Sequence, residues 1–194
     1  MYELSIIALT LAGCVFAVSS IGKLSGREAY RSFRDQLAET RLIPENTVPA
    51  TAAWLAGLEA AAAAALLVAD ALTVAAVPGA AWLAESALTV TAALTAVLAL
   101  GVAAVVRRGT RARCACFGAR SGRPIGRTHL ARNVSLLAVV CAGLVAVPLA
   151  SRLPSLPGAV LAAATGAVTA LLFARWDDIA ALFAPPATAV RRQS

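Results

Sequence analysis

Long runs of apolar residues alternate with short polar connections along this chain. A helix crosses a hydrocarbon core about 30 Å thick with about 20 residues, and five runs reach or approach that length. The runs are continuously apolar, which excludes the alternating pattern of a membrane β-barrel. The pattern predicts an all-α integral membrane bundle of four to five transmembrane helices, because the last run is short and framed by prolines. The predicted spans are about residues 4–22, 49–69, 80–106, 133–150 and 157–174.

The segment at about residues 25–43 has a different, amphipathic pattern. Ser25 and Glu28 match a capping box, and Pro44 is expected to end the helix. We expect one interfacial amphipathic helix here, with its arginines facing anionic headgroups. The apolar residues that repeat at helical spacing along it are Tyr30, Phe33 and Leu37.

Composition and charge support a membrane protein. Hydrophobic residues make up 60% of the chain, charged residues 14%, and the mean hydropathy is +0.79, whereas soluble domains are about 25% charged. The net charge of +7 does not indicate nucleic-acid binding, because all but one of the 17 lysines and arginines lie in connections on the same side of the predicted bundle. Only Arg152 lies on the other side. The positive-inside rule therefore predicts a multi-pass cell-membrane protein with its amino terminus outside and its basic loops and carboxyl terminus in the cytoplasm.

The connection at about residues 107–132 carries the most specific motif, Cys114-Ala115-Cys116-Phe117-Gly118. A C-x-C disulfide closes a very small, strained ring and is therefore easily reduced. Cationic neighbours favour the thiolate, which is the form that attacks a disulfide. The motif predicts a redox dithiol of Cys114 and Cys116, which would make the protein a thiol-disulfide oxidoreductase. The neighbouring cations are Arg111, Arg113, Arg120 and Arg123.

His129 raises two further interpretations of this connection. Together with Cys114 and Cys116 it supplies three zinc ligands, but a structural zinc site takes four and the connection has no other Cys or His, so we expect no metal. His129 is the only histidine and could relay a proton to the thiols near neutral pH. The alternative is that it is solvated or caps the helix that follows.

Three residues inside the predicted spans are further candidates. Glu59 lies about ten residues into the second span, where an ionisable side chain is costly and often functional. At 1.5 Å per residue it lies about 15 Å from the basic face, and Cys14 and Cys141 lie about 13 Å from it. Cys14 and Cys141 could form a second dithiol or thiol relay beside Glu59, which would handle protons or orient a membrane quinone; alternatively, both are apolar fillers. Other charged residues near span ends are expected to snorkel toward water in structural roles, and these are Lys23, Asp70 and Glu85.

Several of these features together resemble the methylamine utilisation protein MauE family, which is related to DoxX-like membrane proteins. They are the stretch from Lys23 to Pro44, Leu58-Glu59, the C-x-C-F-G motif, Ile125-Gly126-Arg127 and Arg132-Asn133. The resemblance covers about residues 4–150, and we expect residues 1–194 to form a single membrane domain. It implies a protein that assists methylamine dehydrogenase production by helping to form disulfides in the small subunit, alongside a thioredoxin-like partner. More broadly, it implies thiol-redox service to a disulfide-containing exported client protein.

Two other functions stay open. A DoxX-like role implies the membrane subunit of a quinone-linked oxidoreductase, and the third alternative is a scaffold or transporter without redox chemistry. The predicted sidedness also constrains the first function. A cytoplasmic C-x-C lies on the wrong face for an exported client, unless electrons pass through the bilayer or the dithiol serves a cytoplasmic thiol system.

Overall fold

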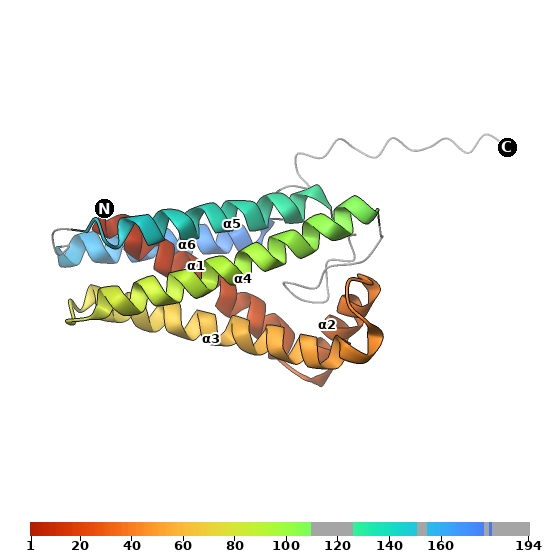
Figure 1. Ribbon diagram of the computed structural model, residues 1–194. Helices are drawn as coiled ribbons and strands as arrows, with labels where there is room; N and C mark the ends of the chain where they lie inside the picture. Colours follow the sequence, from red (N-terminus) through yellow and green to blue (C-terminus); the bar gives the residue numbers. More distant parts are fainter. Residues whose placement is uncertain (110–125, 151–154, 177–178, 180–194) are drawn as a thin grey trace.

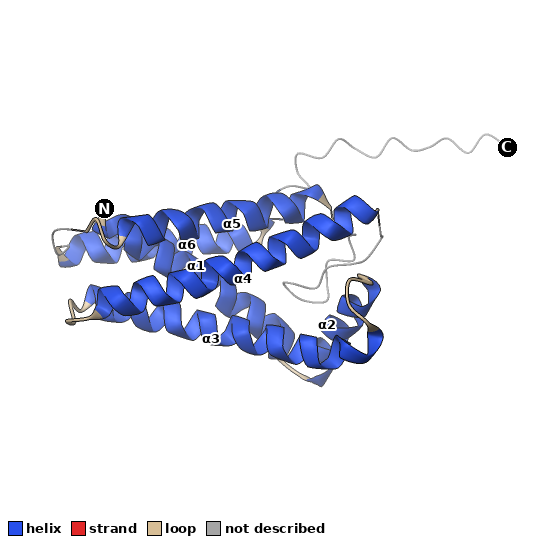
Figure 2. Ribbon diagram, viewed as in Figure 1, coloured by secondary structure: helices blue, strands red, loops and turns tan. Residues whose placement is uncertain are grey.

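The computed structural model describes residues 1–109, 126–150 and 155–176, together with residue 179. Within these residues the chain is helical, without β-strands, and its long helices run up and down in a bundle (Figures 1 and 2). Five helices are long and apolar enough to span a membrane, which confirms the predicted all-α membrane bundle. They are α1 (Tyr2–Leu24), α3 (Val48–Val74), α4 (Ala80–Arg108), α5 (Arg127–Ala146) and α6 (Leu156–Ala174).

One predicted span is displaced along the sequence. The fourth was expected at about residues 133–150, whereas α5 runs from Arg127 to Ala146. Hydropathy assigns the basic residues before Asn133 to a loop. In the structure His129 and Arg132 are 4% and 5% exposed, so they belong to the helix and to the interior of the bundle. The helix ends two residues before Pro148, which cannot continue it.

α1 packs against α3, α5 and α6 and is the most buried of the long helices. Glycines let two of these neighbours approach it closely. A Cβ at Gly143 of α5 would lie 2.5 Å from the Ala8 Cβ, and a Cβ at Gly166 of α6 would lie 2.9 Å from the Ile7 carbonyl oxygen. Helices in lipid associate through such close packing, because the lipid offers no hydrophobic drive.

α2 (Arg27–Glu39) is the expected amphipathic helix. It lies at the end of the bundle where α1 ends and α3 begins (Figure 1). Its Phe33 is buried and packs against Ala52 and Ala56 of α3, with Tyr30 and Leu37 beside it. The apolar face of α2 therefore covers the amino-terminal part of α3.

Both predicted ends of this helix were wrong. Gly26, not Ser25, is the N-cap, and no side chain caps this helix start; Ser25 is instead the C-cap of α1, and its N–H donates to the Ile21 carbonyl at 2.9 Å. The helix also ends at Glu39, before the chain reaches Pro44. The Thr40 hydroxyl donates to the Leu37 carbonyl at 2.6 Å, and Arg41 takes a left-handed conformation at φ 51°. A short 3-10 helix, η1 (Glu45–Thr47), then leads into α3.

The up-and-down order gives the bundle two chemically different ends. The carboxyl ends of α1, α4 and α6 and the amino ends of α3 and α5 share one end, together with α2 (Figure 1). We call it the basic end, because Lys23, Arg108 and Arg127 lie there. Trp54 near the start of α3 and Trp82 at the start of α4 are each 73% exposed, one toward each end, as in the interfacial belts of membrane proteins. The protein is a multi-pass membrane protein in contact with the bilayer, while the compartment that each end faces stays a prediction.

Candidate functional site

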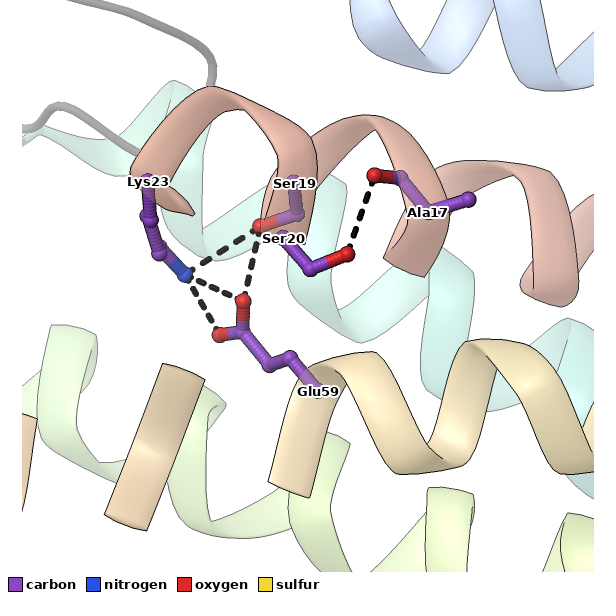
Figure 3. Close-up of polar contacts among 5 residues, drawn as sticks. All are labelled: Ala17, Ser19, Ser20, Lys23 and Glu59. Atoms are coloured by element: carbon purple, nitrogen blue, oxygen red, sulfur yellow. Dashed lines mark hydrogen bonds and ion pairs between the residues drawn. The ribbon is translucent and has the colours of Figure 1, made fainter. Parts of the chain in front are cut away.

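The last turns of α1 and the middle of α3 meet in a buried polar cluster (Figure 3). Lys23 Nζ donates to Glu59 Oε1 at 2.6 Å and also to Oε2. Ser19 lies one helical turn before Lys23 on the same face of α1. Its hydroxyl donates to Glu59 Oε2 at 3.0 Å, and it accepts from Lys23 Nζ at 3.2 Å. The Ser19 hydroxyl therefore contacts both the ammonium and one carboxylate oxygen of the ion pair.

Burial makes this pair unusual. Lys23 is 2% exposed and Glu59 is 1% exposed. The Lys23 ammonium also lies 4.8 Å from the ring centroid of Phe33, so α2 covers it through a cation–π contact. The expectation that Lys23 snorkels toward water was wrong. Its side chain turns inward because a carboxylate and an aromatic face replace the water that it would otherwise seek.

The cluster can hold charge where lipid would not. In a medium of low dielectric constant the two opposite charges stabilise each other strongly, and loss of either removes the counter-ion of the other. Such a loss would act on both α1 and α3.

A small cavity of about 70 Å³ adjoins Glu59 and Ser19. It reaches α5 at Arg132 and Asn133, and apolar side chains of α1, α4 and α5 form the rest of its wall. Pockets that bury small organic ligands measure about 300–1,000 Å³, whereas a single water needs far less space. The cavity that the described residues form beside Glu59 therefore has room for a few waters, and the role of Glu59 toward a quinone stays a prediction.

His129 lies in the first turn of α5, at the basic end. Its Nδ1 accepts a hydrogen bond from the Gly126 N–H at 3.4 Å. This contact satisfies one of the backbone donors that a helix start leaves unpaired. Of the two interpretations of His129, the structure supports the helix cap, since the side chain is buried rather than solvated. The proton relay stays a prediction.

The remaining sequence candidates are distributed as follows. Cys114 and Cys116 lie outside the described residues, between Gly109 after α4 and Gly126 before α5. Cys14 is half-buried and Cys141 is exposed, and both are free thiols. No disulfide joins this pair, and neither cysteine lines the cavity beside Glu59. The interpretation of both as apolar fillers fits this placement, whereas a second dithiol stays a prediction.

Asp70, which was expected to snorkel, is instead buried between α1 and α3. It is 8% exposed, and its Oδ2 accepts a hydrogen bond from Thr10 at 2.7 Å. Glu85, by contrast, is half-buried. Among the described residues, no group of three or more His, Cys, Asp and Glu side chains could hold a metal.

Sequence reasoning identified Glu59 but missed its partners. The signals for Lys23 and Ser19 were present, since the two lie four residues apart and form one face of α1. The sequence contained only a weak indication that Arg132 and His129 would be buried, because basic residues at a span end usually face water. Nothing in the sequence of α2 indicated that Phe33 would cover Lys23.

Comparison with known proteins agrees with this architecture. The family model described as "Methylamine utilisation protein MauE" matches residues 1–146, which include α1 to α5 and the C-x-C motif. No curated protein and no solved structure matches the chain. The match covers about three quarters of the sequence and confirms the resemblance that the motifs suggested. The chain thus belongs to the methylamine utilisation protein MauE family.

Proposed function

We propose that this protein is a membrane thiol-disulfide redox component in which Cys114 and Cys116 alternate between a dithiol and a disulfide. One observation carries the proposal. The C-x-C motif connects α4 to α5, and both flanking residues, Gly109 and Gly126, belong to the basic end of the bundle. The buried Lys23–Glu59 pair lies toward this same end, as do the buried residues at the start of α5.

The C-x-C disulfide is the oxidant of the client, and the disulfide of a thioredoxin-like partner is the oxidant that restores it. A thiolate of a client protein attacks the Cys114–Cys116 disulfide, forms a mixed disulfide with one sulfur and releases the other as a thiolate. The second client thiolate then attacks the mixed disulfide, which leaves the client oxidised and the C-x-C pair reduced. Two electrons pass from the client to the C-x-C pair. Exchange with the disulfide of a thioredoxin-like partner then restores the oxidised pair and reduces that partner.

The family description supports a client class. Membership in a methylamine utilisation family favours a disulfide-containing subunit of an amine-oxidising dehydrogenase as the client. The positive-inside rule predicts that the C-x-C motif faces the cytoplasm. On that orientation the first exchange partner is a cytoplasmic thiol protein, and delivery of oxidising equivalents to an exported client requires a second carrier.

Trapping tests the proposal directly. A Cys116→Ser variant keeps the Cys114 thiol but lacks the sulfur that resolves a mixed disulfide, so it is expected to accumulate an adduct that disappears on reduction. Non-reducing electrophoresis followed by mass spectrometry identifies the adduct. Cys141→Ser is the matched control, because it removes an exposed cysteine of α5 and leaves the C-x-C motif intact.

The result that contradicts the proposal is equally concrete. Failure of both Cys116→Ser and Cys114→Ser to accumulate any mixed disulfide, with both sulfurs reduced and unreactive in the native protein, would exclude thiol exchange. Retained biological function after replacement of all four cysteines would then favour a scaffold or transporter.

A further inference from the structure

α3 carries two buried carboxylates that are compensated very differently. Glu59 has the Lys23 ammonium against both of its oxygens. Asp70, 11 residues further along α3, accepts one hydrogen bond, from the Thr10 hydroxyl to Oδ2. Its other oxygen, Oδ1, is buried and has no hydrogen-bond partner among the described residues. Asp70 thus lacks the internal cation that Lys23 supplies to Glu59.

A second orphaned oxygen lies one helical turn away. Thr73 follows Asp70 by three residues on the same face of α3, and its Oγ1 is also buried without a hydrogen-bond partner among the described residues. Buried polar atoms are paired in the great majority of cases, so two neighbouring exceptions indicate a ligand or an ordered water. Both atoms are oxygens that accept hydrogen bonds or coordinate a cation.

A pocket at the end of the bundle opposite the basic end reaches Thr73, while Asp70 and Thr10 lie beyond its lining. It has a volume of about 270 Å³ and lies between the first turns of α1 and α4 and the connection from α3 to α4. Thr73 lines it, together with Tyr2 and Ser5, while the other lining residues are apolar or glycine. The Tyr2 hydroxyl donates to the Thr73 carbonyl at 2.9 Å, which leaves the phenolic oxygen available as an acceptor. No Lys, Arg or His is among the residues that line the pocket.

We propose that Asp70, Thr73 and Thr10 form a binding site for a small monovalent cation, which enters through the pocket at Tyr2 and Ser5. The cation balances the Asp70 carboxylate as Lys23 balances Glu59. The site offers oxygen atoms only, which suits an alkali metal ion or an ammonium ion. A divalent ion is disfavoured, because hard divalent cations are usually held by several carboxylates and the described residues provide one here.

The single carboxylate of the proposed site supports a cation that carries one positive charge. A carboxylate deep in a membrane bundle is costly unless it is paired, and one monovalent cation cancels its charge without leaving an excess. The pocket volume leaves room for the cation to retain part of its water shell as it enters. The inference uses no cysteine and does not depend on the proposed thiol chemistry.

Thermal unfolding of the purified full-length protein tests the site. Sodium, potassium and ammonium chloride are compared at equal ionic strength with the chloride of N-methylglucamine, whose cation is too bulky to approach Asp70. We expect at least one small cation to raise Tm. Above its dissociation constant, each tenfold increase in its concentration should add about 3–6 °C. The ion series also tells a metal ion from an ammonium ion.

Variants assign the effect to the site. Asp70→Asn is expected to abolish the cation-dependent part of the Tm shift, and Glu85→Gln, which changes another carboxylate in a membrane-spanning helix, is expected to keep it. If Asp70→Asn does not fold, Thr73→Val takes its place and is expected to weaken the affinity for the cation about tenfold. Thr91→Val of α4 is the control for this variant.

Two outcomes overturn the inference. The first combines two measurements: Tm is the same in all four salts, and the infrared spectrum has a protonated carboxylic acid band that Asp70→Asn removes. A proton, and not a cation, then neutralises Asp70. The second is an equal cation-dependent shift in the wild type and in Asp70→Asn, since the cation then binds elsewhere. Neither outcome affects the trapping experiment on Cys114 and Cys116, so the two proposals fail separately.

Discussion

Lys23 and Glu59 are 36 residues apart in the chain and form one neutral, fully buried unit that joins α1 to α3. Because both groups are almost completely buried, the pair differs from a surface ion pair in what a single substitution does. Removal of one partner leaves the other as a buried charge without this counter-ion, whereas removal of both takes away the two opposite charges together.

We therefore predict opposite effects of single and double substitutions at this pair. Lys23→Met and Glu59→Gln should each lower the free energy of unfolding by about 3–5 kcal/mol, and the double variant should recover a large part of the loss. Denaturant unfolding in detergent measures all four proteins as a double-mutant cycle. Additive losses would show that the two side chains do not act together.

Arg34 and Asp35 provide the control for that cycle. Their side chains form an ion pair of 3.1 Å on the surface of α2 and are 42% and 64% exposed. Exposed pairs contribute little, because water and salt screen them. Asp35→Asn should leave the unfolding midpoint close to that of the wild type.

A second prediction concerns the contact of α5 with α1. Gly143→Ala places a Cβ within 2.5 Å of the Ala8 Cβ, which the two helices can only accommodate by moving apart. We expect a loss of about 1–3 kcal/mol in the free energy of unfolding. Ala8→Gly should restore most of it in the double variant. Gly57→Ala is the control, because a Cβ there meets nothing within 4 Å, and an equal loss in that variant would contradict the packing argument.

A third prediction separates the two roles of His129. As an N-terminal cap of α5, it should be replaceable by Gln, which also accepts a hydrogen bond from the Gly126 N–H. His129→Ala should lose about 1 kcal/mol of stability, and His129→Gln should lose less. If His129 were instead a proton relay, His129→Gln would slow thiol exchange and change its pH profile, and stopped-flow exchange with a small disulfide measures both.

A fourth prediction concerns sidedness. If the positive-inside rule holds, a membrane-impermeant maleimide should label Cys114 and Cys116 only after lysis, in a background that lacks Cys14 and Cys141. Ala75→Cys, at the exposed end of α3 opposite the basic end, should be labelled in intact cells. Each labelling is repeated with reductant, which reports the redox state of the C-x-C pair. Labelling of Cys114 in intact cells would reverse the predicted orientation.

The candidate site shows which parts of it the sequence could reveal. Glu59 was identifiable because it is a lone acid in a long apolar run, and that is a local property. Its pairing with Lys23 was not, because it depends on how far α1 slides along α3. The same holds for Asp70, whose position near a span end suggested contact with water until Thr10 was found beside it. The burial of His129 and Arg132 was missed for a related reason, since hydropathy cannot distinguish a basic residue that faces water from one that enters the bundle.

By itself the sequence determined that this protein is a membrane helical bundle of four to five spanning helices, about where the amphipathic α2 lies and which family the chain resembles. These properties follow from the composition and period of contiguous residues, because each membrane helix satisfies its own backbone hydrogen bonds. Only the tertiary structure decided that Lys23 turns inward to Glu59 under Phe33 and that Asp70 keeps an unpaired oxygen. Those outcomes depend on which helix faces meet and at what depth, and no stretch of sequence encodes that alone.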